Sequence, residues 1–324
     1  MRILRTLQTC LLLLLSGLLP IPAAAQKKQV GDLKITILST MLVGDSQGAI
    51  GEWGFAALIE ADGHRVLFDT GAHPETVLRN IHALKLDLSD VTDVILTHNH
   101  PDHTLGLMAL RREFMKKNPA ALSVSHVGKG IFYGRPSASG EENSMDAIRK
   151  DYEAKGGKFV EYNEGAEIFS GAWLSGPIPR KFRERNWSMT GKVQTPNGLV
   201  EDTVPEDQSL ILNTAKGLVV VTGCGHAGIV NILTRSTTQF PKQPVYGIIG
   251  GLHLFAASDE QLNWTADRMK EFKVLNLIGA HCTGIEALYR LRERLGLTRK
   301  SAVVGSVGAS FELADGIHPG PLAR

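Results

Sequence analysis

The chain has 324 residues, of which 43% are hydrophobic and 21% are charged. This composition excludes an intrinsically disordered chain and is typical of a globular protein that buries a sizeable core. The formal net charge of +2 excludes a strongly basic surface, so nucleic acid is not expected as a partner.

The first 25 residues have the pattern of a secretory signal peptide. Arg2 and Arg5 form a short basic start, residues 11–21 form an apolar run, and the small residues Ala23 to Ala25 mark a cleavage site. We therefore expect cleavage after Ala25 and a mature protein of residues 26–324 in the periplasm or outside the cell. No later stretch approaches the ~20 apolar residues of a membrane helix, so we expect no stable membrane insertion.

Short strands are indicated first by residues 33–39, 55–60 and 65–69, and the turn signal Asp62-Gly63 predicts that the last two form a hairpin. Further along, four short apolar runs each end at Gly or His and lead into helical periodicity; these are residues 94–97, 217–223, 245–250 and 274–280. The repeated alternation of strand and helix predicts an α/β fold in which sheets are sandwiched between helices.

Two of the later helices carry start signals. Ser258 with Gln261, and Thr283 with Glu286, have the spacing of capping boxes, in which two side chains satisfy the first free N–H groups of a helix. Gly296 predicts the end of the second of these helices.

Residues 128–206 are rich in Gly, Pro, Ser and charge, with only short apolar runs at 130–133 and 168–174. The sequence assigns little chemistry to this region. No linker divides the chain after the signal segment, so residues 26–324 are predicted to form a single domain.

The densest group of potential metal ligands follows the predicted strand at 94–97. Three of the eleven histidines, His98, His100 and His103, fall within six residues together with Asp102. In extended backbone His98 and His100 point to the same side, because side chains there alternate, so both imidazoles can reach one metal ion. Asp102 and His103 lie at the turn into the next helix, where they can face a second ion. A polar loop whose histidines only hydrogen-bond to backbone is the alternative, and it suits a lone histidine better than this group.

The segment Thr97-His98-Asn99-His100-Pro101-Asp102-His103 resembles the signature of the metallo-β-lactamase superfamily. Two supporting motifs of that superfamily are Phe68-Asp69-Thr70-Gly71 and Gly279-Ala280-His281-Cys282-Thr283-Gly284. Finer similarity points to one branch, the metal-dependent hydrolase-like group that includes the archaeal dihydropterin ribofuranosylaminobenzene phosphate synthase. The segments that carry it are Glu52-Trp53-Gly54-Phe55, Gly176-Pro177-Ile178-Pro179-Arg180, Gly223-Cys224-Gly225-His226 and Gly250-Gly251-Leu252-His253-Leu254.

The resemblance implies a four-layer αββα sandwich with a two-metal site at the strand ends. It implies that one metal is bound by His98 and His100, and that the other is bound by Asp102, His103 and His281. The sequence departs from the superfamily at Cys224, which stands where a bridging aspartate is usual. We assign His226 as the third ligand of the first metal, and the bridging ligand stays open.

Cys224 and Cys282 are the two cysteines that remain after the predicted cleavage. In an exported protein such a pair can form a structural disulfide, which stays an alternative. Each cysteine, however, lies beside His226 or His281, and this placement favours free thiols close to the metals. Cys224 is therefore a candidate metal ligand or a neighbour of the ligands.

Three further residues are candidates for the site. Asp69 precedes Thr-Gly at a strand end, where a carboxylate is expected to orient the ligand histidines by hydrogen bonds. His253 is either a metal ligand or a contact of the substrate. Arg180 opens a charged run within a family-like motif and is predicted to contact an anionic group of the substrate. The histidines expected at the surface are His64, His73, His82 and His318.

The ligands are mostly imidazoles with one carboxylate, which favours two zinc ions, with iron or manganese as alternatives. Such a pair activates water as a hydroxide nucleophile near neutral pH, which suits hydrolysis of a small ester, lactone, amide or phosphodiester. Asp102 is expected both to bind metal and to orient this nucleophile.

Two other functions stay open: a lyase or transferase that forms a pterin-type C–N bond, and a metal-dependent binding protein without turnover. Export argues against the first, because phosphorylated pterin precursors are expected inside the cell. In each enzymatic hypothesis the partner is a small-molecule substrate, and the sequence does not indicate the oligomeric state.

Overall fold

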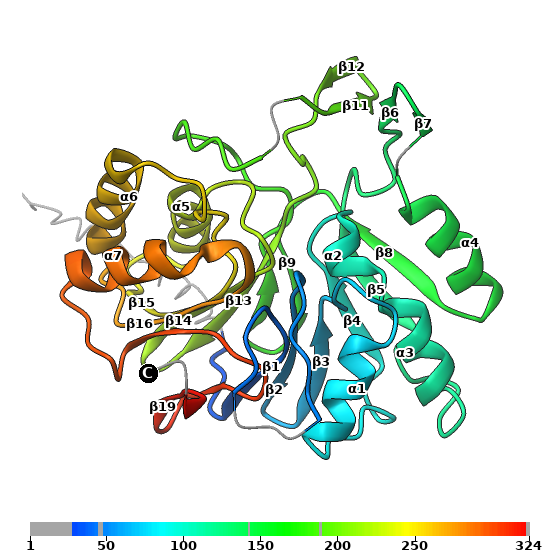
Figure 1. Cartoon of the computed structure of the whole chain (residues 1–324), viewed down its shortest axis with the longest axis horizontal. Helices are drawn as coiled ribbons and strands as arrows, with labels where there is room; N and C mark the ends of the chain where they lie inside the picture. The colour runs from blue at the N-terminus through cyan, green and yellow to red at the C-terminus, as the bar shows by residue number, and fades with distance from the viewer. Residues whose placement is uncertain (1–27, 45–47, 142, 188–189, 322–324) are drawn as a thin grey trace, which may run out of the picture.

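The computed structural model describes residues 28–44, 48–141, 143–187 and 190–321. Two β-sheets lie face to face and helices cover the outer face of each, which gives the four layers that the sequence predicted (Figure 1). The predicted signal segment, residues 1–25, lies outside the described residues.

The first sheet comes mainly from the N-terminal half of the chain and has the strand order β19-β18-β1-β2-β3-β4-β5-β8. Its strands are β1 (Leu33–Ser39), β2 (Ala56–Ala61), β3 (His64–Phe68), β4 (Asp93–Leu96), β5 (Val124–Gly128), β8 (Lys158–Tyr162), β18 (Ser310–Glu312) and β19 (Gly316–His318). The helices α1 (Thr76–Ala83), α3 (Leu107–Phe114) and α4 (Met145–Ala154) pack on its outer face, and the short helix α2 (Pro101–Thr104) follows β4.

The second sheet has the strand order β17-β16-β15-β14-β13-β10-β9. Its strands are β9 (Ala166–Phe169), β10 (Ala172–Leu174), β13 (Ser209–Thr214), β14 (Gly217–Thr222), β15 (Val245–Gly250), β16 (Asn276–Gly279) and β17 (Ala302–Val304). The helices α5 (Ile229–Gln239), α6 (Asp259–Glu271) and α7 (Ile285–Leu295) cover its outer face (Figure 1).

Strand β14 shows how alternating side chains join the layers. Val219 and Val221 lie in the apolar core between the two sheets, whereas Leu218 and Val220 lie in the core beneath α5, α6 and α7. Every residue of β14 is buried, which is why the sequence reads as an uninterrupted apolar run there. The core between the sheets fixes their separation, and the core beneath the helices fixes α5, α6 and α7 on the second sheet, so the loops at the edge are held in place.

Those loops gather because the strands that precede them are parallel. In the first sheet β3, β4 and β5 are parallel, and in the second sheet β14, β15, β16 and β17 are parallel. Carboxyl ends of parallel strands meet at one edge of a sheet. We call the loops that follow β3, β4, β14, β15 and β16 the strand-end rim; they comprise residues 69–72, 97–106, 223–228, 251–257 and 280–284.

Two small hairpins extend beyond this rim (Figure 1). They are formed by β6 (Pro136–Ser137) with β7 (Gly140–Glu141) and by β11 (Lys192–Thr195) with β12 (Gly198–Glu201). Both lie in the region 128–206, to which the sequence assigned little chemistry. The same region contains α4, which was not predicted from the sequence, although its buried residues Met145, Ile148 and Tyr152 have the spacing of one helix face.

The hairpin at Asp62-Gly63 is confirmed, and so is the cap of α6, where the Ser258 hydroxyl accepts a 3.3 Å hydrogen bond from the Gln261 N–H. The second predicted capping box is wrong. The hydroxyl of Thr283 donates to the carbonyl of Gly250 and accepts from the N–H of Leu252, each at 3.1 Å. It therefore joins two loops of the rim, and α7 begins without a side-chain cap.

The predicted end of α7 at Gly296 is confirmed, because this residue adopts the left-handed conformation that closes the helix. Among the described residues, none of the helices combines the length and apolar character needed to cross a membrane.

Candidate metal centre

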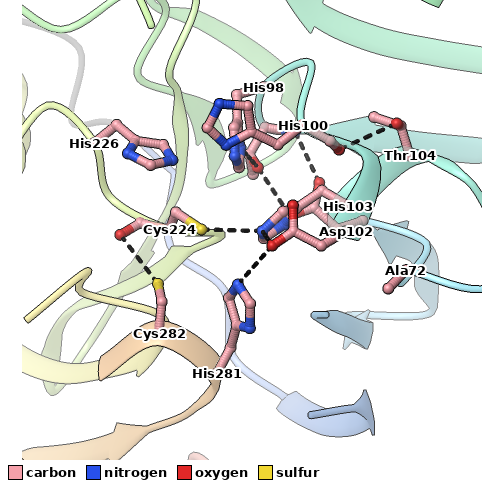
Figure 2. Close-up of polar contacts among 12 residues, drawn as sticks. Ala72, His98, His100, Asp102, His103, Thr104, Cys224, His226, His281 and Cys282 are labelled. Atoms are coloured by element: carbon pink, nitrogen blue, oxygen red, sulfur yellow. Dashed lines mark hydrogen bonds and ion pairs between the residues drawn. The ribbon is translucent and has the colours of Figure 1, made fainter. Parts of the chain in front are cut away.

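The strand-end rim brings the predicted ligands together from both sheets. One set of side chains consists of His98, His100 and His226, whose nitrogens lie within 4.8 Å of one another (Figure 2). The Nδ1 atom of His98 lies 2.9 Å from the Thr97 hydroxyl, and that of His226 donates to the Asn186 carbonyl at 2.5 Å. The Nε2 atoms of both rings are buried and have no hydrogen-bond partner within the described chain. Each ring thus has one nitrogen anchored and the other free, as a metal-ligating histidine requires.

The second set consists of Asp102, His103, Cys224 and His281, whose ligand atoms also lie within 4.8 Å of one another. His103 Nε2 lies 3.0 Å from the Cys224 sulfur, and His281 Nε2 lies 3.2 Å from Asp102 Oδ2 (Figure 2). Two imidazoles, a carboxylate and a thiol form a donor set that suits zinc. The two sets adjoin, since the ring centroids of His98 and His103 are 4.3 Å apart.

Cys224 also belongs to a third set, with His253 and Cys282. Both cysteines are free and buried in the structure, so the alternative of a disulfide is not what the structure shows. The Cys282 sulfur lies 3.8 Å from the Cys224 carbonyl oxygen. The sequence placed His253 and both cysteines at or near the metals, but it named only Cys224 and His253 as candidate ligands; that Cys282 shares a set with them was not predicted.

Asp69 occupies the supporting position that the sequence predicted for it. Its Oδ2 atom lies 2.7 Å from His103 Nδ1 and accepts a 2.8 Å hydrogen bond from the Thr97 hydroxyl, while Oδ1 accepts from the Thr97 N–H at 2.8 Å. Through Thr97 the same carboxylate also orients His98. Gly223 permits this approach, because a Cβ atom there would lie 2.2 Å from the Thr97 hydroxyl oxygen.

The electrostatic environment separates neutral from charged ligands. Burial lowers the pKa of His98 and of His226 well below the usual value, and it lowers the pKa of His100 to about 4, so these three imidazoles are neutral. Burial acts in the same direction on His281, but Cys282 and Asp102 outweigh it and raise the pKa of His281 to about 10. The second set therefore favours positive charge, which a bound cation would also supply.

Asp102 remains ionised despite its partial burial. Desolvation acts to raise its pKa, but the neighbouring His103 and His281 hold that pKa well below the usual value. Burial raises the pKa of the Cys224 thiol, and the adjacent Cys282 adds to this effect. A cation is the group that would stabilise Cys224 as a thiolate, because coordination deprotonates a thiol.

The predicted role of Arg180 is corrected by the structure. Its Nη1 donates to the His226 carbonyl at 2.6 Å, and its Nη2 donates to the carbonyls of Thr203 and of Val204. The guanidinium also lies 5.0 Å from the ring centroid of Trp187. Arg180 therefore holds loops beside the site together instead of presenting its terminal nitrogens to an anion.

The first turn of α5 is likewise occupied. The carboxylate of Glu184 accepts hydrogen bonds from the N–H groups of Val230 and Asn231 at 3.1 and 2.9 Å. An anionic substrate group is therefore not needed to satisfy this helix terminus. The four histidines predicted at the surface, His64, His73, His82 and His318, are all exposed.

A cavity of about 710 Å³ opens next to the first set of ligands. It is lined by His100, Asn99, Ser137, Lys192 and Asp202, among others. Arg135 also lines the cavity, and its Nη2 donates to both carboxylate oxygens of buried Glu206 at 2.9 and 2.8 Å. The sequence did not identify Glu206, because its partners lie far away in the chain. The two hairpins of residues 136–141 and 192–201 contribute to the cavity, so the region without assigned chemistry forms one of its walls.

Comparison with known proteins gives the same architecture. Residues 54–235 match the Metallo-beta-lactamase superfamily. The chain is 30% identical over 266 residues to the 7,8-dihydropterin-6-methyl-4-(beta-D-ribofuranosyl)-aminobenzene-5'-phosphate synthase of Methanocaldococcus jannaschii, covering 80% of this chain and 90% of that protein.

Two solved structures are similar in fold. The structure of Tm1679, a metal-dependent hydrolase of the beta-lactamase superfamily, aligns with a TM-score of 0.69 and 25% identity over 87% of this chain and 99% of its own. A diphosphatase from the PhnP family aligns with a TM-score of 0.50 and 14% identity over 88% of this chain and 98% of its own, which indicates the fold alone.

Proposed function

Because this chain belongs to the metallo-beta-lactamase superfamily, we propose that it is a metal-dependent hydrolase of a small ester, lactone, amide or phosphodiester. The observation that carries the proposal is the pair of adjoining ligand sets, one of which includes His100 at the wall of the cavity. A substrate in the cavity would reach the metal centre directly.

The side chains that would hold two cations are His98, His100 and His226 for the first and Asp102, His103, Cys224 and His281 for the second. The unpartnered Nε2 atoms of His98 and His226 fit this role, as does the mixture of imidazole, carboxylate and sulfur donors. When bound, such a pair supplies Lewis acidity and lowers the pKa of water toward about 7.

The remaining steps fall to the side chains of the chain itself. Asp102 is the only carboxylate of the two sets, and its side chain is 19% exposed, so it can both bind a cation and accept a proton from water. Asp69 fixes the ring of His103 and, through Thr97, that of His98. His100 belongs to the first set and lines the cavity, so the bond to be broken would be placed beside it.

The test is metal removal and restoration with a panel of hydrolase substrates. We expect the metal-free protein to be inactive and zinc to restore turnover of at least one ester, lactone, amide or phosphodiester. Asp102→Asn should lower kcat at least about 100-fold, the scale of a lost general base. Asp93→Asn, which changes a carboxylate at the other end of β4, serves as the matched control. Activity that persists without metal would contradict the proposal.

The second candidate function is a C–N bond-forming enzyme of the pterin type, which the 30% identity to the archaeal synthase favours. Product formation from a ribofuranosylaminobenzene phosphate and a dihydropterin that carries a leaving group on its 6-methyl carbon, with release of that group, would support it over hydrolysis. We further propose that the protein is exported, as residues 1–25 indicate, and export argues against this second function because phosphorylated precursors are expected in the cytoplasm.

A further inference from the structure

Two aromatic side chains stand exposed at the edge of the metal centre. Trp53, in the segment before β2, is 46% exposed, and Phe255, in the loop after β15, is 52% exposed. Their ring centroids are 5.4 Å apart and their planes are inclined by 82°, so the two rings form a corner. Large exposed aromatic side chains that lie together are typical of binding sites.

The corner directly adjoins candidate metal ligands. The ring centroid of Trp53 is 4.9 Å from that of His281, and the ring centroid of Phe255 is 5.3 Å from that of His253. One wall of the corner is thus next to the second ligand set and the other is next to the third. A group held in this corner would be a few bonds from the metal centre.

The backbone around Trp53 is firmly fixed. The buried carboxylate of Glu52 accepts hydrogen bonds from the Ser39 hydroxyl at 2.6 Å and from the N–H groups of Ala72 and His73 at 3.0 Å each. After the tryptophan, Gly54 leaves no room for a side chain, since a Cβ atom there would lie 2.8 Å from the Asp102 carbonyl oxygen. Trp53 is therefore held in place by its neighbours on both sides.

The same is true of Phe255. Its N–H donates to the Cys282 carbonyl at 3.2 Å, which ties it to the loop that carries His281. Gly284 packs beneath it, and a Cβ atom at Gly284 would lie 2.7 Å from the Phe255 Cα. Because the backbone that carries both rings is fixed before binding, a ligand that packs against them orders little backbone.

We propose that Trp53 and Phe255 form a binding subsite for a planar aromatic group of the substrate, whose reacting bond lies at the metal centre. This inference rests on the proposed function for the position of the reacting bond. A flat ring can stack on one wall of the corner and meet the other wall edge-on, the two geometries that aromatic pairs prefer. The cavity beside His100 is then left for the other part of the substrate.

The test compares two carboxylates with the same charged end, 3-(2-naphthyl)propanoate and butanoate. Their dissociation constants for the zinc-loaded protein are measured by calorimetry. We expect the naphthyl compound to bind at least about tenfold more tightly, and Trp53→Ala and Phe255→Ala each to reduce this preference about tenfold. Trp53→Phe should retain most of it. Tyr289→Ala, which removes an aromatic ring that is 42% exposed on α7, should leave it unchanged.

Because both rings contact candidate ligands, metal content is measured in every variant, and Trp53→Phe and Phe255→Leu replace any alanine variant that loses metal. Equal binding of the two carboxylates by the wild type, or a preference that survives both substitutions, would overturn the subsite.

Turnover of the methyl esters of these two carboxylates distinguishes a failure of the subsite from a failure of the proposed function. If neither ester is hydrolysed while naphthyl binding depends on Trp53, the subsite stands and ester hydrolysis does not. If both esters are hydrolysed with the same KM, hydrolysis stands and the subsite does not.

Discussion

Replacing Asp69 by Asn should weaken both metal sites without changing a single ligand. The residue is fully buried and adopts a positive φ of 54°, a conformation that Asn tolerates, so the substitution preserves size and backbone. The asparagine oxygen can still accept from the Thr97 N–H. Its NH2 group, however, must then face the Thr97 hydroxyl and His103 Nδ1, which both donate to the carboxylate in the wild type.

His103 can meet that NH2 group only with an unprotonated Nδ1, which moves its proton to Nε2, the nitrogen that lies 3.0 Å from Cys224. Thr97 can accept from the NH2 group and then donate to His98 Nδ1, which moves the proton of His98 to its own free Nε2. Both histidines would then present an N–H to the metal. The cost is about 1.5–3 kcal/mol for each lost charged hydrogen bond. Loss of a carboxylate that supports a ligand lowers metal affinity about 10- to 100-fold, which is the same scale.

The assay is zinc titration against a chromophoric chelator, with circular dichroism as the check on folding. Asp93→Asn is the matched control, because Asp93 pairs with His126 Nε2 at 2.8 Å at the opposite end of β4. We expect a 10- to 100-fold loss of zinc affinity for Asp69→Asn and wild-type affinity for Asp93→Asn. Two zinc ions bound with wild-type affinity in Asp69→Asn, or an equal loss in the control, would refute the reasoning.

Four other predictions follow from the site and the sequence. Elemental analysis of the purified mature protein should find close to two transition-metal ions per chain, as the two adjoining ligand sets require; a metal-free but active preparation would contradict this. After metal removal, Cys224 and Cys282 should react with an alkylating agent without prior reduction, whereas a requirement for reduction would indicate a disulfide. Mass spectrometry of the exported form should find Gln26 or a close neighbour at the N-terminus, and full-length cytoplasmic protein as the sole species would count against export. Arg180→Ala should lower the free energy of unfolding by about 1–3 kcal/mol, because it leaves carbonyls unpaired, and should affect anionic and neutral substrates equally; a selective loss on anionic substrates would restore Arg180 to the substrate site.

The sequence predicted the layers and the gathering of ligands because both depend on local patterns. A strand such as β14 is buried on both faces, so its run of apolar residues predicts a strand without knowledge of the strands beside it. The loops that end such runs meet at one rim, so His98, His226 and His281 could be assigned to one place although 183 positions separate the first from the last. These loops meet because the strands before them, β14, β15 and β16, run parallel and therefore end at the same edge of the sheet.

The remaining features depend on hydrogen-bond and packing partners that are distant in the chain, so the local sequence does not predict them. Arg180 has the residue type of an anion contact, but backbone carbonyls 23 to 46 positions away bind its guanidinium. Thr283 has the spacing of a cap, but the carbonyl of Gly250 competes for its hydroxyl. Trp53 and Phe255 meet across about two hundred positions of sequence and were not recognised as a pair, since neither has a local pattern that predicts exposure.

The ligand chemistry bears on metal choice more directly than superfamily membership does. The three neighbouring sets contain six imidazoles and two thiols but only one carboxylate, that of Asp102. Magnesium and calcium prefer sites built from oxygen, whereas sulfur and imidazole donors favour zinc over harder cations. A cysteine at the position of the usual bridging aspartate strengthens that preference, because it replaces a hard donor with a soft one next to His103. On these grounds we propose zinc, and we expect the second set, which contains Cys224, to discriminate against manganese more strongly than the first.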